Sequence, residues 1–285
     1  MLLLDSLSGV FVYSLEEITS GSNEENYSLG RARLRGGENS TYPTSLYSTK
    51  TLSNMIRNVL QKPCLDTEWY TEVVVNTENP EQTEFFIVTL PNTIGSNTLR
   101  RTTPPVKGDQ GGSYKALVHH ACLDKQSEHV LVILDSTGKG LSSASAQGSW
   151  ALKLDGKKKP TPTKNFKYIR TFRFGPKRTC FSVGFKLFSL LLRTDDYPEE
   201  TSWKLTKEID ATVAVASGSG YTKGLSLYEI CTFDYGKLHF TIEDEGGDGL
   251  CCNHGVGFFV AFYDGEPFLN GAKFGKKYDF MIPKP

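Results

Sequence analysis

Apolar and polar residues alternate in short runs along most of this chain, which is the pattern of β-strands with one buried face. Leu238–Ile242 is typical, and Asp264-Gly265 is the signal of a tight β-hairpin turn. In the C-terminal third the runs are Phe185–Arg193, Ser202–Thr206, Thr212–Ala216, Leu225–Phe233, Leu238–Glu243, Val256–Tyr263 and Tyr278–Ile282. Seven or eight short strands in about 100 residues predict an all-β, two-sheet sandwich of jelly-roll or immunoglobulin-like topology.

The same pattern occurs twice. A shift of 109 residues places Cys122 over Cys231. Without a gap, these segments then coincide: Val130–Asp135 with His239–Asp244, Gly138–Leu141 with Gly247–Leu250, Gly148–Trp150 with Gly257–Phe259, and Asp155-Gly156 with Asp264-Gly265. We infer two tandem sandwiches, a degenerate copy one at 62–177 and an intact copy two at 178–285, and a length of 285 residues has room for both.

Residues 1–61 have a different composition. The stretch 20–47 is rich in Ser, Asn, Glu and Gly and poor in aliphatic residues, so we expect this low-complexity segment to be largely disordered. Residues 51–61 could form a short helix. Two glycosylation sequons begin at Asn26 and Asn39, where a glycan would be tolerated, although such triplets also arise by chance in Ser- and Asn-rich sequence.

Charge and hydropathy exclude two classes of partner. Lys plus Arg and Asp plus Glu are equal at 32 each, so no net field attracts nucleic acid. No apolar run approaches the ~20 residues of a membrane-spanning helix, so we expect no membrane insertion. The first residues, Met1–Asp5, lack the basic and apolar regions of a signal peptide. Either the chain is not secreted by the ordinary route or its reading frame begins further upstream.

Two acidic segments of copy two contain candidate metal ligands. Asp195, Asp196 and Glu199 lie in the first segment, and Asp244 and Asp248 lie in the second beside three glycines. Ca²⁺ takes 6–8 oxygen ligands, and a glycine-rich loop lets carboxylates and carbonyls converge on one point. We therefore predict one Ca²⁺ site in copy two. The alternative is a solvated acidic turn, because Asp and Gly are ordinary turn formers.

Copy one lacks this acidic character. Lys139 stands in the position of Asp248, and Ser136 stands in the position of Glu245. A lysine ammonium at that position would repel a cation. The predicted site therefore belongs to copy two alone.

Copy two resembles a known repeat module. Residues 195–203 (Asp-Asp-Tyr-Pro-Glu-Glu-Thr-Ser-Trp) and 244–252 (Asp-Glu-Gly-Gly-Asp-Gly-Leu-Cys-Cys) are similar to its paired motifs, Asp-Asn-Tyr-Pro-x-Glu-Thr-Ser-Trp and Asp-x-x-Gly-Asp-Gly-Ile-Cys-Cys. The module occurs in large secreted and cell-surface proteins of marine microalgae and bacteria, often beside metallopeptidase domains. The resemblance covers nearly all of copy two and implies an accessory β-sandwich, adhesive or carbohydrate-associated, without catalytic residues. The chain departs from the family at 236–238, where Gly-Lys-Leu replaces Gly-Cys-Tyr, so one cysteine of the usual framework is absent.

The repeat also suggests how the six cysteines pair. Cys64 and Cys180 occupy equivalent positions in the two copies, as do Cys122 and Cys231. We therefore predict Cys64–Cys122 and Cys180–Cys231 disulfides and leave the adjacent Cys251 and Cys252 unassigned. Two alternatives stay open: a bridge from Cys231 to Cys251 or Cys252, and six reduced thiols in a cytosolic chain.

These observations favour a non-catalytic extracellular or cell-surface protein for binding or adhesion, stabilised by calcium, with a glycan or a cell-surface protein as its partner. Tyr197 and Trp203 are the candidate aromatic residues for ligand contact. One alternative is a secreted hydrolase, or an accessory fragment of a peptidase, in which Asp244 and Asp248 act as acid and base. Another is an intracellular, metal-free interaction domain.

Overall fold

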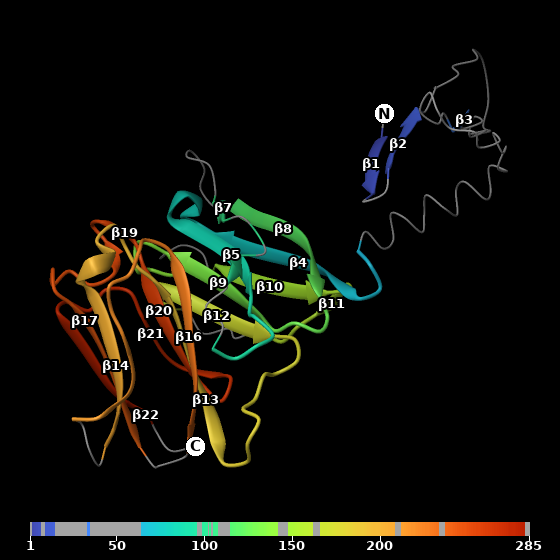
Figure 1. The fold of residues 1–285 in the computed structure, drawn as a ribbon. Helices are drawn as coiled ribbons and strands as arrows, with labels where there is room; N and C mark the ends of the chain where they lie inside the picture. Colours follow the sequence, from blue (N-terminus) through green and yellow to red (C-terminus); the bar gives the residue numbers. More distant parts are fainter. Residues whose placement is uncertain are drawn as a thin grey trace. The chain divides into compact units, whose positions relative to one another are not determined.

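The fold is described from a computed structural model (Figure 1). It describes the following residues: 2–6, 9–14, 33–34, 64–95, 99–101, 103, 105–107, 115–141, 148–161, 166–208, 212–233 and 237–282. Contacts within the chain group residues 64–285 into one compact unit, distinct from residues 1–63.

The N-terminal unit contains one small antiparallel sheet. Its strands are β1 (Leu2–Ser6), β2 (Gly9–Ser14) and β3 (Arg33–Leu34), in the order β1-β2-β3. Most of the low-complexity segment, the predicted helix at 51–61 and both sequons, at Asn26 and Asn39, lie outside the described residues. Those expectations stay predictions.

Copy one is a sandwich of two antiparallel sheets. Its elements are β4 (Glu68–Thr77), the 3-10 helix η1 (Pro80–Gln82), β5 (Thr83–Thr89), β6 (Arg100–Arg101), β7 (Val106–Lys107), β8 (Lys115–Asp124), β9 (His129–Asp135), β10 (Ser149–Leu154), β11 (Lys157–Lys158) and β12 (Ile169–Phe174). One sheet has the order β11-β10-β4-β8. The other has the order β12-β9-β5-β6, and β7 also pairs with β5.

Copy two has the same architecture. Its elements are β13 (Phe185–Arg193), the 3-10 helix η2 (Pro198–Glu200), β14 (Thr201–Lys207), β15 (Ala214–Gly218), β16 (Leu225–Phe233), β17 (Leu238–Asp244), β18 (Cys251–Cys252), β19 (Gly255–Val256), β20 (Phe258–Tyr263), β21 (Glu266–Gly271) and β22 (Lys277–Ile282). Its sheets have the orders β16-β13-β20-β21 and β15-β14-β17-β22, and β18 pairs with β19.

The strand order in the two four-stranded sheets of copy two therefore repeats that of copy one, whereas β7 of copy one and the β18–β19 pair of copy two have no counterpart among the described residues. The register repeats as well, because Thr83 lies opposite Asp135 and Thr201 lies opposite Asp244. Both Asp-Gly hairpin turns have positive φ at each residue, including Asp155 at 49° and Asp264 at 52°, as a type I′ turn requires. The predicted all-β fold of two sandwiches is confirmed. Among the described residues there is no helix long and apolar enough to cross a membrane.

Each sandwich has its own core, filled by the side chains that alternate inward from its two sheets. In copy two the inward residues include Phe188, Leu190 and Leu192 of β13, Trp203 and Leu205 of β14, Phe240 and Ile242 of β17, and Phe259 and Ala261 of β20. In copy one they include Val73 and Val75 of β4, Phe85 and Ile87 of β5, Leu131 and Ile133 of β9, and Trp150 and Leu152 of β10.

A third core joins the two copies. It contains Phe86, Val88, Val130, Val132 and Leu134 from copy one, and Leu191, Leu227, Phe258, Val260 and Phe262 from copy two. The sheet containing β5, β9 and β12 thus packs against the sheet containing β13, β16 and β20 (Figure 1). Every residue of β9 and of β20 is buried because both faces of each strand are covered.

Buried ion pairs cross the same interface. The Arg178 guanidinium contacts Glu128 of copy one at 3.1 Å and also binds Glu229 of copy two. Arg193 Nη1 lies 2.7 Å from Glu84 Oε1. These pairs and the third core join the two copies into the one compact unit of residues 64–285.

All six cysteines form disulfides. Cys64 is bonded to Cys122 and Cys180 to Cys231, as the repeat predicts. The unassigned Cys251 and Cys252 are bonded to each other. The alternative bridge from Cys231 to one of this adjacent pair is therefore wrong.

Candidate metal centre in the second copy

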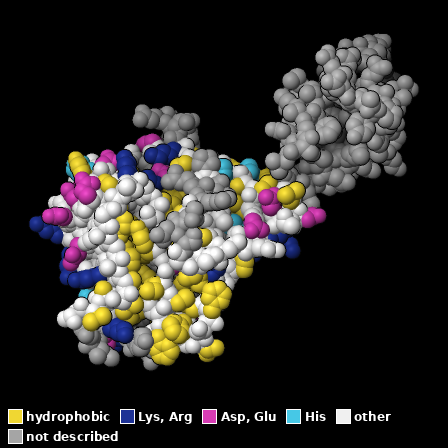
Figure 2. Space-filling model, viewed as in Figure 1, with side chains coloured by type: hydrophobic (Ala, Val, Ile, Leu, Met, Phe, Trp, Pro, Cys, Tyr) yellow, Lys and Arg dark blue, Asp and Glu magenta, His cyan; other side chains and the backbone are white. Residues whose placement is uncertain are grey.

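The acidic segments of copy two meet at one end of its sandwich, where β13 ends, β14 begins and β17 ends. Alternation along these strands directs Thr194, Thr201 and Asp244 toward the inside of the sandwich, in line with the core residues before or after them. All three are almost completely buried. Acidic side chains gather over this end of the copy, near β19 (Figure 2).

The carboxylate of Asp244 organises the acidic loop after β17. Its Oδ2 accepts backbone hydrogen bonds from Gly247 at 2.6 Å, Asp248 at 3.1 Å and Gly249 at 3.0 Å. The loop needs glycine at 249 because φ is +77° there and a Cβ would lie 2.8 Å from the backbone nitrogen of Phe274. The strand end, the loop and the carboxylate are therefore fixed together.

Three carboxylates converge on this loop. Oxygens of Glu200, Asp244 and Asp248 all lie within 4.8 Å of one another. Glu200 comes from the end of η2, one residue before the Thr201 that pairs with Asp244. We call Glu200, Asp244 and Asp248 the carboxylate triad. Their spacing is that of groups able to share one cation.

The electrostatics of this end favour a positive charge. Burial raises the pKa of Glu200, and so do the negative charges of Asp244, Glu199, Asp195 and Asp248. Burial also raises the pKa of Asp195, against a hydrogen bond from the Tyr197 backbone that lowers it, and Asp244 and Asp248 raise it further. The carboxylates thus oppose one another's ionisation, and a bound cation would relieve that repulsion.

Two buried hydroxyls at this end of copy two have no hydrogen-bond partner. Thr194 is 4% exposed and Thr201 is fully buried, and neither Oγ1 is hydrogen-bonded. In copy one the equivalent hydroxyls of Thr77 and Thr83 bond to each other at 2.9 Å. A buried polar group without a partner costs free energy. The pair in copy two is therefore left available for a ligand that the pair in copy one does not need.

The structure changes the predicted ligand set. Asp244 and Asp248 belong to the triad, but Asp195, Asp196 and Glu199 do not. Asp195 is buried and accepts the Tyr197 backbone N–H at 3.0 Å. Asp196 pairs with Lys223, and Glu199 is exposed.

Glu200, which completes the triad, was missed by sequence reasoning. The signal that could have found it is the strand register, because the residue before Thr201 must lie beside the turn that follows Asp244. An acidic run by itself does not say which of its carboxylates faces the loop.

Copy one provides an internal comparison. Asp135 Oδ2 accepts the backbone N–H groups of Lys139 at 2.8 Å and Gly140 at 2.7 Å, so this aspartate organises its turn just as Asp244 does. The triad position of Glu200 is held by Gln82, whose Oε1 accepts the Ser136 hydroxyl. With glutamine and lysine in place of two carboxylates, copy one keeps the turn and loses the cluster.

The two predicted aromatic contacts differ in accessibility. Tyr197 is 42% exposed, and its ring lies edge-to-face against His254 with centroids 5.0 Å apart. Trp203 is only 4% exposed and packs against Phe188 and Tyr228 in the core of copy two. The prediction of Trp203 as a ligand-stacking residue is therefore corrected, because Trp203 lies on the side of β14 that faces the core.

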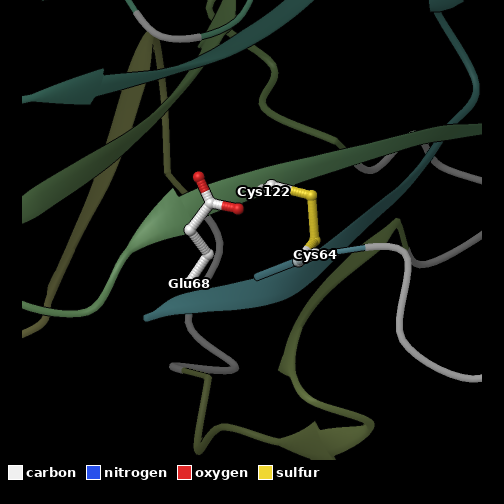
Figure 3. A group of neighbouring side chains, drawn as sticks. All are labelled: Cys64, Glu68 and Cys122. Atoms are coloured by element: carbon white, nitrogen blue, oxygen red, sulfur yellow. A yellow bond between two sulfur atoms is a disulfide. The ribbon is translucent and has the colours of Figure 1, made fainter. Parts of the chain in front are cut away.

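A second group of potential metal ligands is explained by a disulfide. Cys64, Glu68 and Cys122 lie together, but the two sulfurs are bonded to each other (Figure 3). The Glu68 carboxylate accepts the Leu65 backbone N–H at 3.1 Å. Without thiolates this group has no metal-binding chemistry.

The outer face of copy two contains a shallow polar pocket of about 210 Å³. It is lined by residues of β14, β15 and β17 and of the turn after β15: Ser202, Trp203, Lys204, Ser217, Gly218, Ser219, Thr241 and Glu243. Hydroxyls and one residue of each charge dominate this lining, so the pocket is a second, separate place for a polar ligand.

Comparison of the chain with protein-family models, curated proteins and solved structures found no match in any of the three.

Proposed function

We propose that this protein is a non-catalytic, extracellular binding or adhesion protein whose second sandwich is stabilised by one calcium ion at the carboxylate triad. The observation that carries the proposal is the contrast between the copies. Copy two combines three converging carboxylates with two unpartnered buried hydroxyls, whereas copy one has a neutral amide, an ammonium and a satisfied hydroxyl pair at the same positions. The resemblance to a secreted repeat module agrees with this proposal.

Calcium is the cation that suits these groups. Carboxylate and hydroxyl oxygens are hard ligands, and the site offers no sulfur. Three hydrogen bonds converge on Oδ2 of Asp244, which leaves Oδ1 to face an ion. Ca²⁺ tolerates the irregular geometry of such a loop better than Mg²⁺, which demands a near-ideal octahedron.

The same geometry disfavours a hydrolase. Acid–base hydrolysis needs two carboxylates set on either side of a scissile bond, about 5 Å or more apart. Here the oxygens lie within 4.8 Å of one another, and Asp244 is occupied with the backbone of its own loop. Three disulfides support an oxidising compartment and disfavour the intracellular alternative.

The experiment is a thermal melt of the full chain in EDTA and in calcium chloride. A cation at 100 times its dissociation constant stabilises the folded state by about 2.7 kcal/mol, which for a unit of this size raises Tm by roughly 5–10 °C. Isolated copy two is unsuitable, because cutting it free would expose the apolar face that carries Leu191, Phe258 and Val260.

Two variants define the site. Asp248→Lys copies the residue of copy one and should abolish the calcium-dependent rise in Tm without unfolding the protein. Glu245→Lys makes the same charge change in the same loop at an exposed position outside the triad, and should keep most of the rise. An equal Tm of the unmodified chain in EDTA and in calcium would show that the triad is a solvated acidic turn.

A further inference from the structure

The ligand set that copy two offers to a calcium ion is incomplete on its solvent side. Glu200, Asp244 and Asp248 give three oxygens if each carboxylate uses one, and the buried, unpartnered hydroxyls of Thr194 and Thr201 at the same end of the sandwich would add two more at most. These five groups are fewer than the 6–8 oxygens that Ca²⁺ takes. Asp244 is buried, but Glu200 and Asp248 are partly exposed. The remaining coordination positions therefore face solvent.

An exposed aromatic ring stands beside this open side. The His254 ring contacts both neighbours: its Nε2 lies 4.0 Å from Asp248 Oδ2, and its centroid lies 5.0 Å from that of Tyr197. Hydrogen bonds hold the backbone that carries the two rings, because the Asp196 N–H donates to the His254 carbonyl at 2.7 Å and the Tyr197 N–H donates to Asp195. The ring of Tyr197 is thus a partly exposed apolar surface that the His254 ring connects to Asp248 of the triad.

Copy one lacks the ring as well as two of the three carboxylates. Asn79 occupies the N-cap of η1 with φ −117° and ψ 68°, and Tyr197 occupies the N-cap of η2 with φ −118° and ψ 65°. The backbone is the same, so folding does not require the aromatic side chain. The gapless alignment also places Ser145 in the position of His254. The features that could bind a ligand therefore occur together in copy two and are absent together from copy one.

We propose that the ion at the carboxylate triad binds a neutral sugar, with two adjacent sugar hydroxyls completing its coordination and the apolar face of the sugar packing on Tyr197. This inference rests on the proposed calcium site and specifies its ligand class. Sugar hydroxyls are oxygen ligands that can replace water on Ca²⁺, and an aromatic ring beside them supplies apolar contact. The exposed acidic residues Glu199 and Glu245, which adjoin Glu200 and Asp244 in the sequence, disfavour anionic sugars.

The test is retention of the full chain on immobilised neutral sugars (mannose, galactose, glucose, fucose and N-acetylglucosamine), with polygalacturonate as the anionic comparison. We expect retention on at least one neutral sugar in calcium chloride, with release by EDTA and by the free methyl glycoside. Tyr197→Asn inserts the residue that copy one has on the same backbone. It should weaken retention roughly three- to tenfold while the calcium-dependent rise in Tm persists. Phe181→Asn removes a more exposed ring elsewhere, 97% against 42% for Tyr197, and should leave retention unchanged.

Four outcomes would overturn the inference. If calcium raises Tm but no neutral sugar is retained, the sugar is wrong and the calcium site stands. If calcium has no effect on Tm and no sugar is retained, the calcium site is wrong and the sugar inference falls with it. Retention that persists in EDTA would place the sugar elsewhere, with the polar pocket between β14, β15 and β17 as the next candidate. Retention on polygalacturonate alone would refute a neutral ligand.

Discussion

The third core predicts that the two sandwiches unfold together and that contacts across it are energetically coupled. Phe86 of β5 and Phe258 of β20 are fully buried, and their rings face each other across the interface with centroids 6.4 Å apart. Each Phe→Leu change removes about three carbon atoms from a close-packed site, so each should cost about 1–3 kcal/mol of the free energy of unfolding. The aromatic contact itself is worth about 0.5–1.5 kcal/mol. A double-mutant cycle should therefore give a coupling energy of that size.

The assay is equilibrium urea unfolding followed by tryptophan fluorescence. Trp69 and Trp150 report on copy one and Trp203 on copy two, so a shared core predicts one transition with a single midpoint and m-value. Phe181→Leu, at a 97% exposed position, is the control and should change stability by less than about 0.5 kcal/mol. Two separate transitions, or a coupling energy below about 0.3 kcal/mol, would mean that the copies are independent modules and that the interface does not form.

Three further predictions follow from the same structure. Replacing both Cys180 and Cys231 by serine opens a loop with a sequence separation of 51 and should cost about 4 kcal/mol; an unchanged urea midpoint would contradict it. Burial lowers the pKa of His129, against the opposing effects of its hydrogen bond to the Asp124 backbone and the charges of Asp124 and Glu128. The unfolded chain therefore takes up the proton first as pH falls below about 6.5, so stability should fall with it, and His129→Gln should flatten the pH dependence of Tm in that range. Arg178→Met leaves the buried Glu229 without its cation and should cost about 3–5 kcal/mol in urea unfolding, whereas a loss below about 1 kcal/mol would mean that the pair is solvated.

The elements of copy two could be predicted from the sequence because each strand has one face in its own core and ends at a turn residue. Phe185–Arg193 and Leu225–Phe233 have the predicted ends, and the other predicted strands are found within a few residues of theirs. The equivalence of the two copies gave both long-range disulfides. The alternation could not show which sheet covers the second face of β9 and of β20. The runs 130–134 and 258–263 are apolar at nearly every position, which is the mark of strands covered on both faces.

The residues of the candidate site were predicted only in part because a sequence does not show where each charged side chain points. The acidic segments indicated the end of the sandwich where the carboxylate triad lies, but the sequence does not tell which of the adjacent Glu199 and Glu200 faces the loop. Trp203 looked like a contact residue because it lies in the same motif as Tyr197. Its strand position makes it a core residue, since alternation along β14 directs Trp203 and Leu205 to the same side. These distinctions depend on register, which exists only once strands have paired.

The duplication separates the residues that build this sandwich from those that would bind something with it. Asp135 and Asp244 are the same residue in both copies, and each accepts backbone N–H groups of its own turn, so the aspartate is needed for folding whether or not an ion is present. The residues that change between the copies, Gln82 for Glu200 and Lys139 for Asp248, leave that turn intact. When a residue differs between the copies and the backbone stays the same, the fold does not depend on that side chain. The carboxylates of Glu200 and Asp248 are thus not required by the turn that they adjoin, and the proposed cation would give them a role outside the fold.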